Sequence, residues 1–226
     1  MKKSAFIGCF LLLFLSKYVT AQDFNDDARL WLYLKLDKKI APRLRAQFIM
    51  QNRFDDNIRT YGQVNFNGEL NYKLLGWLRL TGGYVFGKVQ RKDLNYSNRH
   101  QTYAGFSVHT QHDKWKLAWR GLIQMQMKNV YSSENGKVTH WYARNKFTVT
   151  YELNKRYELY VAEELNSPFN EFSQLPVNRT RSFVGVVYNL TRSSYIETYF
   201  LLQKKYSFNS PPGRDFIYGL TFSHSF

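Results

Sequence analysis

The sequence has almost no cysteine, and this scarcity excludes several kinds of chemistry. Its single cysteine, Cys9, lies in an apolar segment near the start of the chain. If that segment is removed during export, the mature protein has no disulfide, no thiolate metal site and no thiol nucleophile. A glycine-rich phosphate loop, a His-Glu zinc motif and a solenoid-type repeat are also absent from the sequence.

The chain also lacks an apolar run long enough for a membrane-spanning helix. Its apolar run at residues 5–15 follows Lys2 and Lys3 and precedes a small-residue site at residues 19–21. This order is typical of a secretory signal peptide, since a spanning helix needs about 20 apolar residues. We predict that residues 1–21 are a cleaved signal peptide and that residues 22–226 form one domain.

Acidic residues are scarce, because 17 Asp and Glu stand against 32 Lys and Arg. The basic residues form no runs, and an exported protein seldom meets nucleic acid, so we predict no nucleic-acid partner. The expected partners are outer-membrane lipids, lipopolysaccharide and anionic solutes. Aromatic residues make up 18% of the chain, which fits a protein at a water–lipid boundary, where Tyr and Trp are enriched.

Beyond the signal peptide no segment has a helical period, and alternating runs of about ten residues recur instead. They predict an all-β fold, a transmembrane antiparallel up-and-down β-barrel of the outer-membrane type with about 10–12 strands. Since single-chain bacterial barrels usually have an even strand number, we expect residues 22–27 to be a degraded strand or a segment threaded through the lumen. The eleven recognisable runs are residues 28–36, 42–53, 59–72, 77–87, 99–111, 115–128, 140–152, 156–166, 179–190, 195–205 and 216–226.

The connections between runs alternate between short turns and longer polar loops. Outer-membrane barrels have short periplasmic turns and longer external loops, so this pattern places Phe226 at the periplasmic end. A final aromatic residue resembles the end of the closing strand of such barrels. We therefore predict that Phe226 is the assembly signal and that the barrel-assembly machinery is a partner.

Each run has a polar face and an apolar face. The polar faces are predicted to line a basic lumen, with Arg43, Arg45, Arg53, Arg79, Arg99, Arg120, Arg144, Lys146, Arg179, Arg181, Glu152, Glu164 and Glu197. The apolar faces are predicted to contact lipid, with Leu30, Leu32, Leu34, Phe48, Phe66, Leu80, Phe106, Trp119, Phe147, Phe200, Leu220 and Phe222.

Two polar residues fall on the apolar faces, Asn145 and Glu163. Because a charge at the bilayer midplane costs on the order of 2 kcal/mol, we expect Glu163 to lie near one end of the barrel or to follow a β-bulge.

Several short motifs resemble an uncharacterised family of exported proteins, domain-of-unknown-function family 2490. They lie at residues 99–101, 120–124, 143–151, 162–166 and 178–181, and they span nearly the whole mature chain. Asn98 replaces the acidic residue expected before the pair Arg99–His100. The resemblance implies an outer-membrane β-barrel and supplies no established activity.

The sequence is compatible with two kinds of lumen. One is a narrow, anion-favouring pore, in which rings of Arg and Lys select anions. The other is a lumen filled by Arg–Glu pairs and Tyr hydroxyls. An alternative is binding of a glycan, lipid or partner protein by the loops around residues 95–96, Tyr131 and residues 211–212. A lipid hydrolase is a weaker alternative, based on Ser107 with His109 or on residues 223–225.

We predict no catalytic site, no metal site and no cofactor. The acids at residues 55–57 and 163–164, the latter beside Asn166, lack the spacing of a known calcium loop and are interpreted as solvated.

A secreted lipocalin-like barrel would have the same alternation but would place its apolar faces inside. We predict instead that the protein stays in the membrane fraction after alkaline carbonate extraction and changes its gel migration on heating, because its apolar faces contact lipid. Release into the soluble fraction by carbonate would favour the lipocalin-like arrangement.

Overall fold

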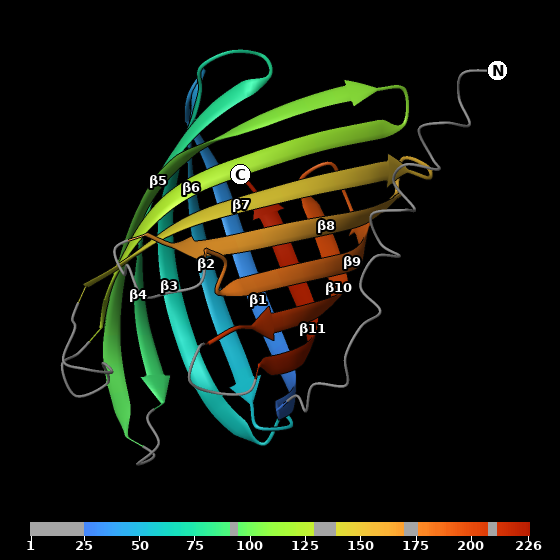
Figure 1. The fold of residues 1–226 in the computed structure, drawn as a ribbon. Helices are drawn as coiled ribbons and strands as arrows, with labels where there is room; N and C mark the ends of the chain where they lie inside the picture. The colour runs from blue at the N-terminus through green and yellow to red at the C-terminus, as the bar shows by residue number, and fades with distance from the viewer. Residues whose placement is uncertain (1–24, 91–94, 129–138, 170–175, 208–211) are drawn as a thin grey trace.

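Eleven strands form one closed barrel, with strongly tilted strands (Figure 1). The structure is a computed structural model, and it describes residues 25–90, 95–128, 139–169, 176–207 and 212–226. The predicted signal peptide lies outside these residues. The strands are β1 (Asn25–Ala41), β2 (Leu44–Asp55), β3 (Thr60–Lys73), β4 (Leu78–Gln90), β5 (Tyr96–His112), β6 (Trp115–Lys128), β7 (Thr139–Glu152), β8 (Tyr157–Pro168), β9 (Arg179–Asn189), β10 (Ser194–Lys205) and β11 (Gly213–Ser225).

The first and last strands close the barrel, and they pair in parallel. Their register runs without interruption from Asn25 opposite Gly213 to Asp37 opposite Ser225. The expectation of an even strand number is therefore wrong. With eleven strands that alternate in direction, β1 and β11 run the same way, so closure requires a parallel seam. Residues 25–27, which were expected to be a degraded strand or a threaded segment, begin β1.

The connections alternate in length as the sequence indicates. Residues 42–43, 74–77, 113–114, 153–156 and 190–193 form short connections at one end of the barrel, here called the turn end. The strand ends that the other five connections join lie at the opposite end, here called the loop end. Phe226 lies at the turn end, where its backbone N–H donates to the Asp37 carbonyl at 2.9 Å, and its side chain is 71% exposed.

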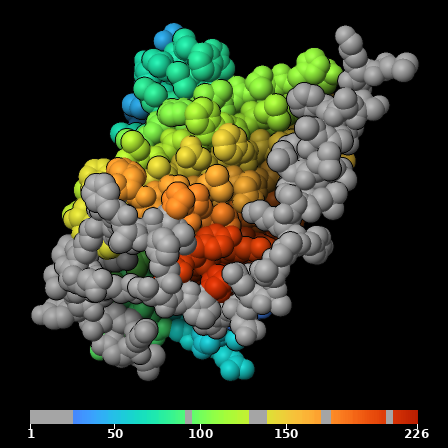
Figure 2. Space-filling model, viewed as in Figure 1, coloured from blue at the N-terminus to red at the C-terminus, as the bar shows by residue number. Residues whose placement is uncertain are grey.

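The outer wall of the barrel carries the apolar faces of the strands. Nine of the twelve side chains predicted to contact lipid are exposed there, and Leu30, Leu32 and Phe106 are partly buried. Over β6 to β8 the wall is a continuous surface of packed side chains (Figure 2). This arrangement rules out the lipocalin-like alternative. No helix formed by the described residues is long and apolar enough to cross a membrane.

Asn145 and Glu163 both lie on the outer wall. The Trp119 indole N–H donates to the Asn145 side-chain oxygen at 3.3 Å. Glu163 lies in the middle of β8, opposite Phe147 and Ser182, and neither pairing of β8 contains a bulge. The expectation that Glu163 lies near one end of the barrel or follows a bulge is therefore wrong. Glu164 must face inward to reach its arginine partners, and strand alternation then turns Glu163 outward.

Inside the barrel, three tyrosines lie over glycines of the neighbouring strand. A Cβ added at any of these glycines would overlap the tyrosine ring, so the glycines make room for the aromatic side chains. The three cross-strand pairs are Tyr103 over Gly83, Tyr160 over Gly185 and Tyr199 over Gly219.

Two of these tyrosines belong to an apolar cluster that fills one side of the lumen. Tyr160 and Tyr199 pack there with Trp31, Leu201 and Ile217, and both aliphatic side chains have no exposed surface. The cluster comes from β8, β10, β11 and β1, so it packs behind the parallel seam.

We predict that Gly219→Val destabilises the barrel by about 1–3 kcal/mol, because the new side chain overpacks against Tyr199 beside the seam. Urea unfolding of the vesicle-inserted barrel, followed by tryptophan fluorescence, measures the effect. Gly68→Val is the matched control, since Gly68 also lies in a strand but has nothing within 4 Å of an added Cβ. Equal stability of the two variants would contradict the prediction.

Candidate functional site

The barrel lumen holds a cavity of about 400 Å³ that is lined by residues from all eleven strands. Alternation within each strand turns the polar side chains inward, so the charged residues of distant strands meet in one space. Nine of the thirteen residues predicted to line the lumen do line this cavity. They are Arg53, Arg99, Arg120, Arg144, Lys146, Arg179, Arg181, Glu164 and Glu197.

The other four do not line the cavity, because their strands extend past it toward the turn end. Arg43 is exposed in the connection between β1 and β2, and Arg79 is the second residue of β4. Arg45 pairs with Asp37 at 3.0 Å. Glu152 pairs with Lys116 at 2.6 Å. The alternation identifies the inward face correctly but contains no information about depth along the barrel.

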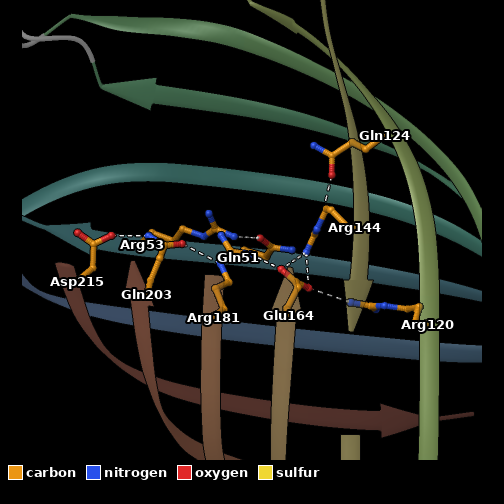
Figure 3. Close-up of polar contacts among 9 residues, drawn as sticks. All are labelled: Gln51, Arg53, Arg120, Gln124, Arg144, Glu164, Arg181, Gln203 and Asp215. Atoms are coloured by element: carbon orange, nitrogen blue, oxygen red, sulfur yellow. Dashed lines mark hydrogen bonds and ion pairs between the residues drawn. The ribbon is translucent and has the colours of Figure 1, made fainter. Parts of the chain in front are cut away.

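A buried carboxylate, Glu164, is the centre of the polar network in the cavity. Its side chain is 3% exposed and contacts guanidinium groups from three other strands (Figure 3). Arg144 donates to both carboxylate oxygens, at 3.0 and 2.9 Å. Arg181 donates to one of them at 2.8 Å, and Arg120 lies 3.8 Å away. A buried carboxylate requires such compensation, since an unpaired charge out of water is strongly unfavourable.

Side-chain amides extend this network along the inner wall of the barrel. The Gln124 carbonyl oxygen accepts from Arg144 at 3.0 Å, and the Gln203 carbonyl oxygen accepts from Arg181 at 2.7 Å. The Gln203 amide in turn donates to Asp215. The result is a polar belt from β6 to β11 (Figure 3).

A second carboxylate, Glu197, lies closer to the turn end. It accepts a hydrogen bond from the Tyr160 hydroxyl at 2.6 Å and pairs with Lys35 at 3.5 Å. On the opposite side of the lumen, the Tyr103 hydroxyl donates to Glu69 at 2.7 Å. Tyrosines that rest on glycines therefore also hold two of the lumen carboxylates.

Three arginines near the loop end have no carboxylate partner among the described residues. Arg53 donates to the Gln51 side chain at 3.0 Å and stacks over Trp31, with its guanidinium carbon 4.1 Å from the ring centre. Arg99 and Arg179 form no ion pair with any described residue. Among the described residues, the lumen is therefore charge-compensated at its centre and has unpaired positive charge toward the loop end.

The cavity lining as a whole is basic. It contains eight basic side chains, the seven predicted ones and Lys35, against three acidic ones, Glu69, Glu164 and Glu197. The predicted set omits Lys35, Trp31 and the amides Gln51, Gln124 and Gln203. All five occupy inward positions of their strands, so strand alternation could have identified them. Selection by charge explains why the four neutral side chains were omitted, but it does not explain the omission of Lys35.

The described residues do not form the Ser–His arrangement that the lipid-hydrolase hypothesis requires. Ser107 and His109 share the inward face of β5, but no hydrogen bond joins them in the part of the chain that the structure describes. His224 lies on the outer wall, where its Nδ1 contacts the Ser194 hydroxyl at 2.8 Å. Within the described ranges, no group of three His, Cys, Asp or Glu side chains could hold a metal ion.

The loop-binding alternative depends largely on residues outside the described ranges, which include Tyr131 and Pro211. Tyr96 is described, and its hydroxyl donates to the Tyr61 carbonyl at 2.9 Å.

Comparisons with known proteins give a family and one solved structure with a similar fold, the NanC porin. A family model described as a protein of unknown function, DUF2490, matches residues 28–212. No curated protein matches the sequence. The solved NanC porin is 15% identical with a TM-score of 0.53, over 88% of this chain and 99% of that one. An anion-selective porin from Comamonas acidovorans is 12% identical with a TM-score of 0.41, over 80% of this chain and 53% of that one.

We predict that Glu164→Gln destabilises the barrel by roughly 3 kcal/mol or more, because it leaves buried guanidinium groups without their carboxylate. Urea unfolding of the vesicle-inserted protein measures the loss. Glu152→Gln is the control, since its partner Lys116 and Glu152 itself are about one-third exposed, and such a pair contributes about 0–1 kcal/mol. A Glu164 variant as stable as the Glu152 variant would show that the network is not structural.

Proposed function

We propose a function for this chain, which belongs to the DUF2490 family of proteins of unknown function: it is a narrow, anion-favouring pore in the bacterial outer membrane. The observation that carries the proposal is the charge of the cavity in the lumen, whose lining has eight basic side chains and three acidic ones.

The outer wall supports the membrane location. Large apolar side chains are exposed around the barrel, among them Phe147 at 50%, Phe200 at 45% and Phe222 at 41%. A barrel in water would bury such side chains, whereas a barrel in lipid presents them to the acyl chains. A closed sheet also has no unpaired edge, which a lipid environment requires. The predicted signal peptide provides the route to the periplasm.

The distribution of charge supports a preference for anions. Glu164 is neutralised by its own arginines, so it does not attract cations into the lumen. Arg53, Arg99 and Arg179 face the cavity near the loop end and create a positive potential on the path of an entering solute. Rings of Arg and Lys favour anions in other pores for this reason.

The space inside the barrel favours a narrow pore over a filled lumen. The apolar cluster of β8, β10, β11 and β1 occupies one side only, and a cavity of about 400 Å³ remains beside it. The cavity extends along the barrel, since its lining includes both Arg99, near the loop end of β5, and Lys35, deep in β1. The lining is hydrophilic, so water and small solutes can occupy it.

We predict that the purified protein forms discrete conductance steps in planar bilayers and that its reversal potential in a KCl gradient shows a preference for chloride. In the triple variant Arg53→Gln, Arg99→Gln, Arg179→Gln, the ratio of anion to cation permeability should fall roughly threefold or more, because fixed charges in a cleft create potentials of several kT.

The control variant carries Arg43→Gln, Arg156→Gln and Arg192→Gln. It loses the same charge from exposed turns at the other end of the barrel and should keep the wild-type selectivity. Conductance no greater than the bilayer leak would reject the pore and favour the filled lumen. Steps with cation selectivity would reject the anion preference.

A further inference from the structure

The three arginines near the loop end come from separate strands and converge on one region of the cavity. Arg179 is the first residue of β9, Arg99 is near the start of β5, and Arg53 is near the end of β2. All three line the cavity. Arg179 lies within electrostatic range of Arg181, which is already paired with Glu164, and Arg53 is within range of both Arg99 and Arg179. The three guanidinium groups therefore form one cluster.

Three carboxylates that the structure describes near this end of the barrel, Asp27, Asp55 and Asp215, are already engaged elsewhere. Arg29 contacts Asp27 at 2.8 Å, Asp55 at 3.0 Å and Asp215 at 3.3 Å. Asp215 also contacts Lys205 at 2.8 Å. Asp27 additionally accepts the backbone N–H of Asn57 at 2.8 Å, which anchors the connection between β2 and β3. These acids are committed to local pairs, and none of them forms an ion pair with the three-arginine cluster.

Two of the clustered arginines also have unused hydrogen-bonding capacity. The Nε atoms of Arg53 and Arg179 are buried and have no hydrogen-bond partner among the described residues. Buried donors without acceptors and like charges held close together are both unfavourable. An anion that carries several oxygen atoms would remove both costs at once, because guanidinium groups match carboxylate and phosphate oxygens in fork geometry.

Neutral donors surround the cluster. Gln63, Gln101 and Gln126 line the same cavity on β3, β5 and β6, and so does Asn166 on β8. Their amide groups can contact additional oxygens of a ligand without adding charge. Chloride, which is a single atom, cannot use several separated donors at once.

We propose that Arg53, Arg99 and Arg179 form a saturable binding site for a multivalent oxyanion of the phosphate or carboxylate type. The inference deepens the proposed function and rests on it in one respect, namely that the lumen is open to solutes. It does not require ions to pass through the whole barrel. The site selects a class of solute at the entrance, and the belt around Glu164 lies beyond it.

The test is isothermal titration calorimetry of the folded, full-length mature barrel in detergent with pyrophosphate or citrate at constant ionic strength in NaCl. Both anions should bind at one saturable site in the wild type. Each of the variants Arg53→Gln, Arg99→Gln and Arg179→Gln should raise the Kd on the order of tenfold, since each removes a charge-assisted contact. Arg179→Lys should give a smaller loss, because lysine keeps the charge but not the fork.

The matched controls are Arg156→Gln and Arg192→Gln, which remove exposed arginines at the turn end and should bind as the wild type does. Heat-modifiable gel migration confirms that every variant is folded. The lumen variants are expected to fold, because removing a member of the cluster lowers repulsion among like charges.

The two anions identify the ligand class, since tighter binding of pyrophosphate assigns a phosphate and tighter binding of citrate assigns a carboxylate. The proposal is overturned if neither anion binds above the chloride background, or if the lumen variants bind as the turn-end controls do. Saturable, arginine-dependent binding to a barrel without conductance would support the oxyanion site and reject the pore. Anion-selective conductance without such binding would support the pore and reject the oxyanion site.

Discussion

Backbone pairing between β1 and β11 closes the sheet, and every other feature of the barrel depends on this closure. A single open edge would leave a row of unpaired N–H and C=O groups, which is unfavourable in water and far more so in lipid. Because the seam is parallel, the odd number of strands is no obstacle to closure. The apolar cluster of Trp31, Tyr199 and Ile217 packs directly behind the seam. The strands that meet there are thus held by side chains as well as by backbone hydrogen bonds.

Closure creates an interior in which charges from distant strands must be balanced. Glu164 on β8 meets arginines from β6, β7 and β9, and no local stretch of sequence could supply this arrangement. The same inward position of Glu164 forces Glu163 onto the outer wall, where a carboxylate is unfavourable in lipid. The position of Glu163 is therefore explained by what Glu164 contributes inside the lumen. The unfavourable position of Glu163 on the outer wall therefore accompanies the compensated charge of Glu164 on the inner wall.

Charge compensation in the lumen is uneven, so the centre of the barrel and its loop end differ in charge. At the centre, carboxylates, arginines and amides form a connected belt. Toward the loops, Asp27, Asp55 and Asp215 are occupied by Arg29 and Lys205, so the three-arginine cluster keeps its excess charge. In the proposed pore, a solute that enters from the loop end would meet the three-arginine cluster first and the neutralised belt second.

The sequence by itself determined the fold class, the number of recognisable runs, the alternation of short and long connections and the face on which each side chain lies. These follow from the period of two along a strand, which is a local property. Arg53 and Arg99 could therefore be assigned to the lumen, and Phe147 and Phe222 to the outer wall, without a structure. Only the tertiary structure decided the parallel seam, the depth of each residue along the barrel and the choice of ion-pair partners. Arg79 and Glu152 have the same alternation as Arg181 and Glu164, yet they lie outside the cavity. The register between strands and the tilt of the strands decide how deep each residue lies in the barrel and which residue it pairs with. Register and tilt are fixed only when the sheet closes.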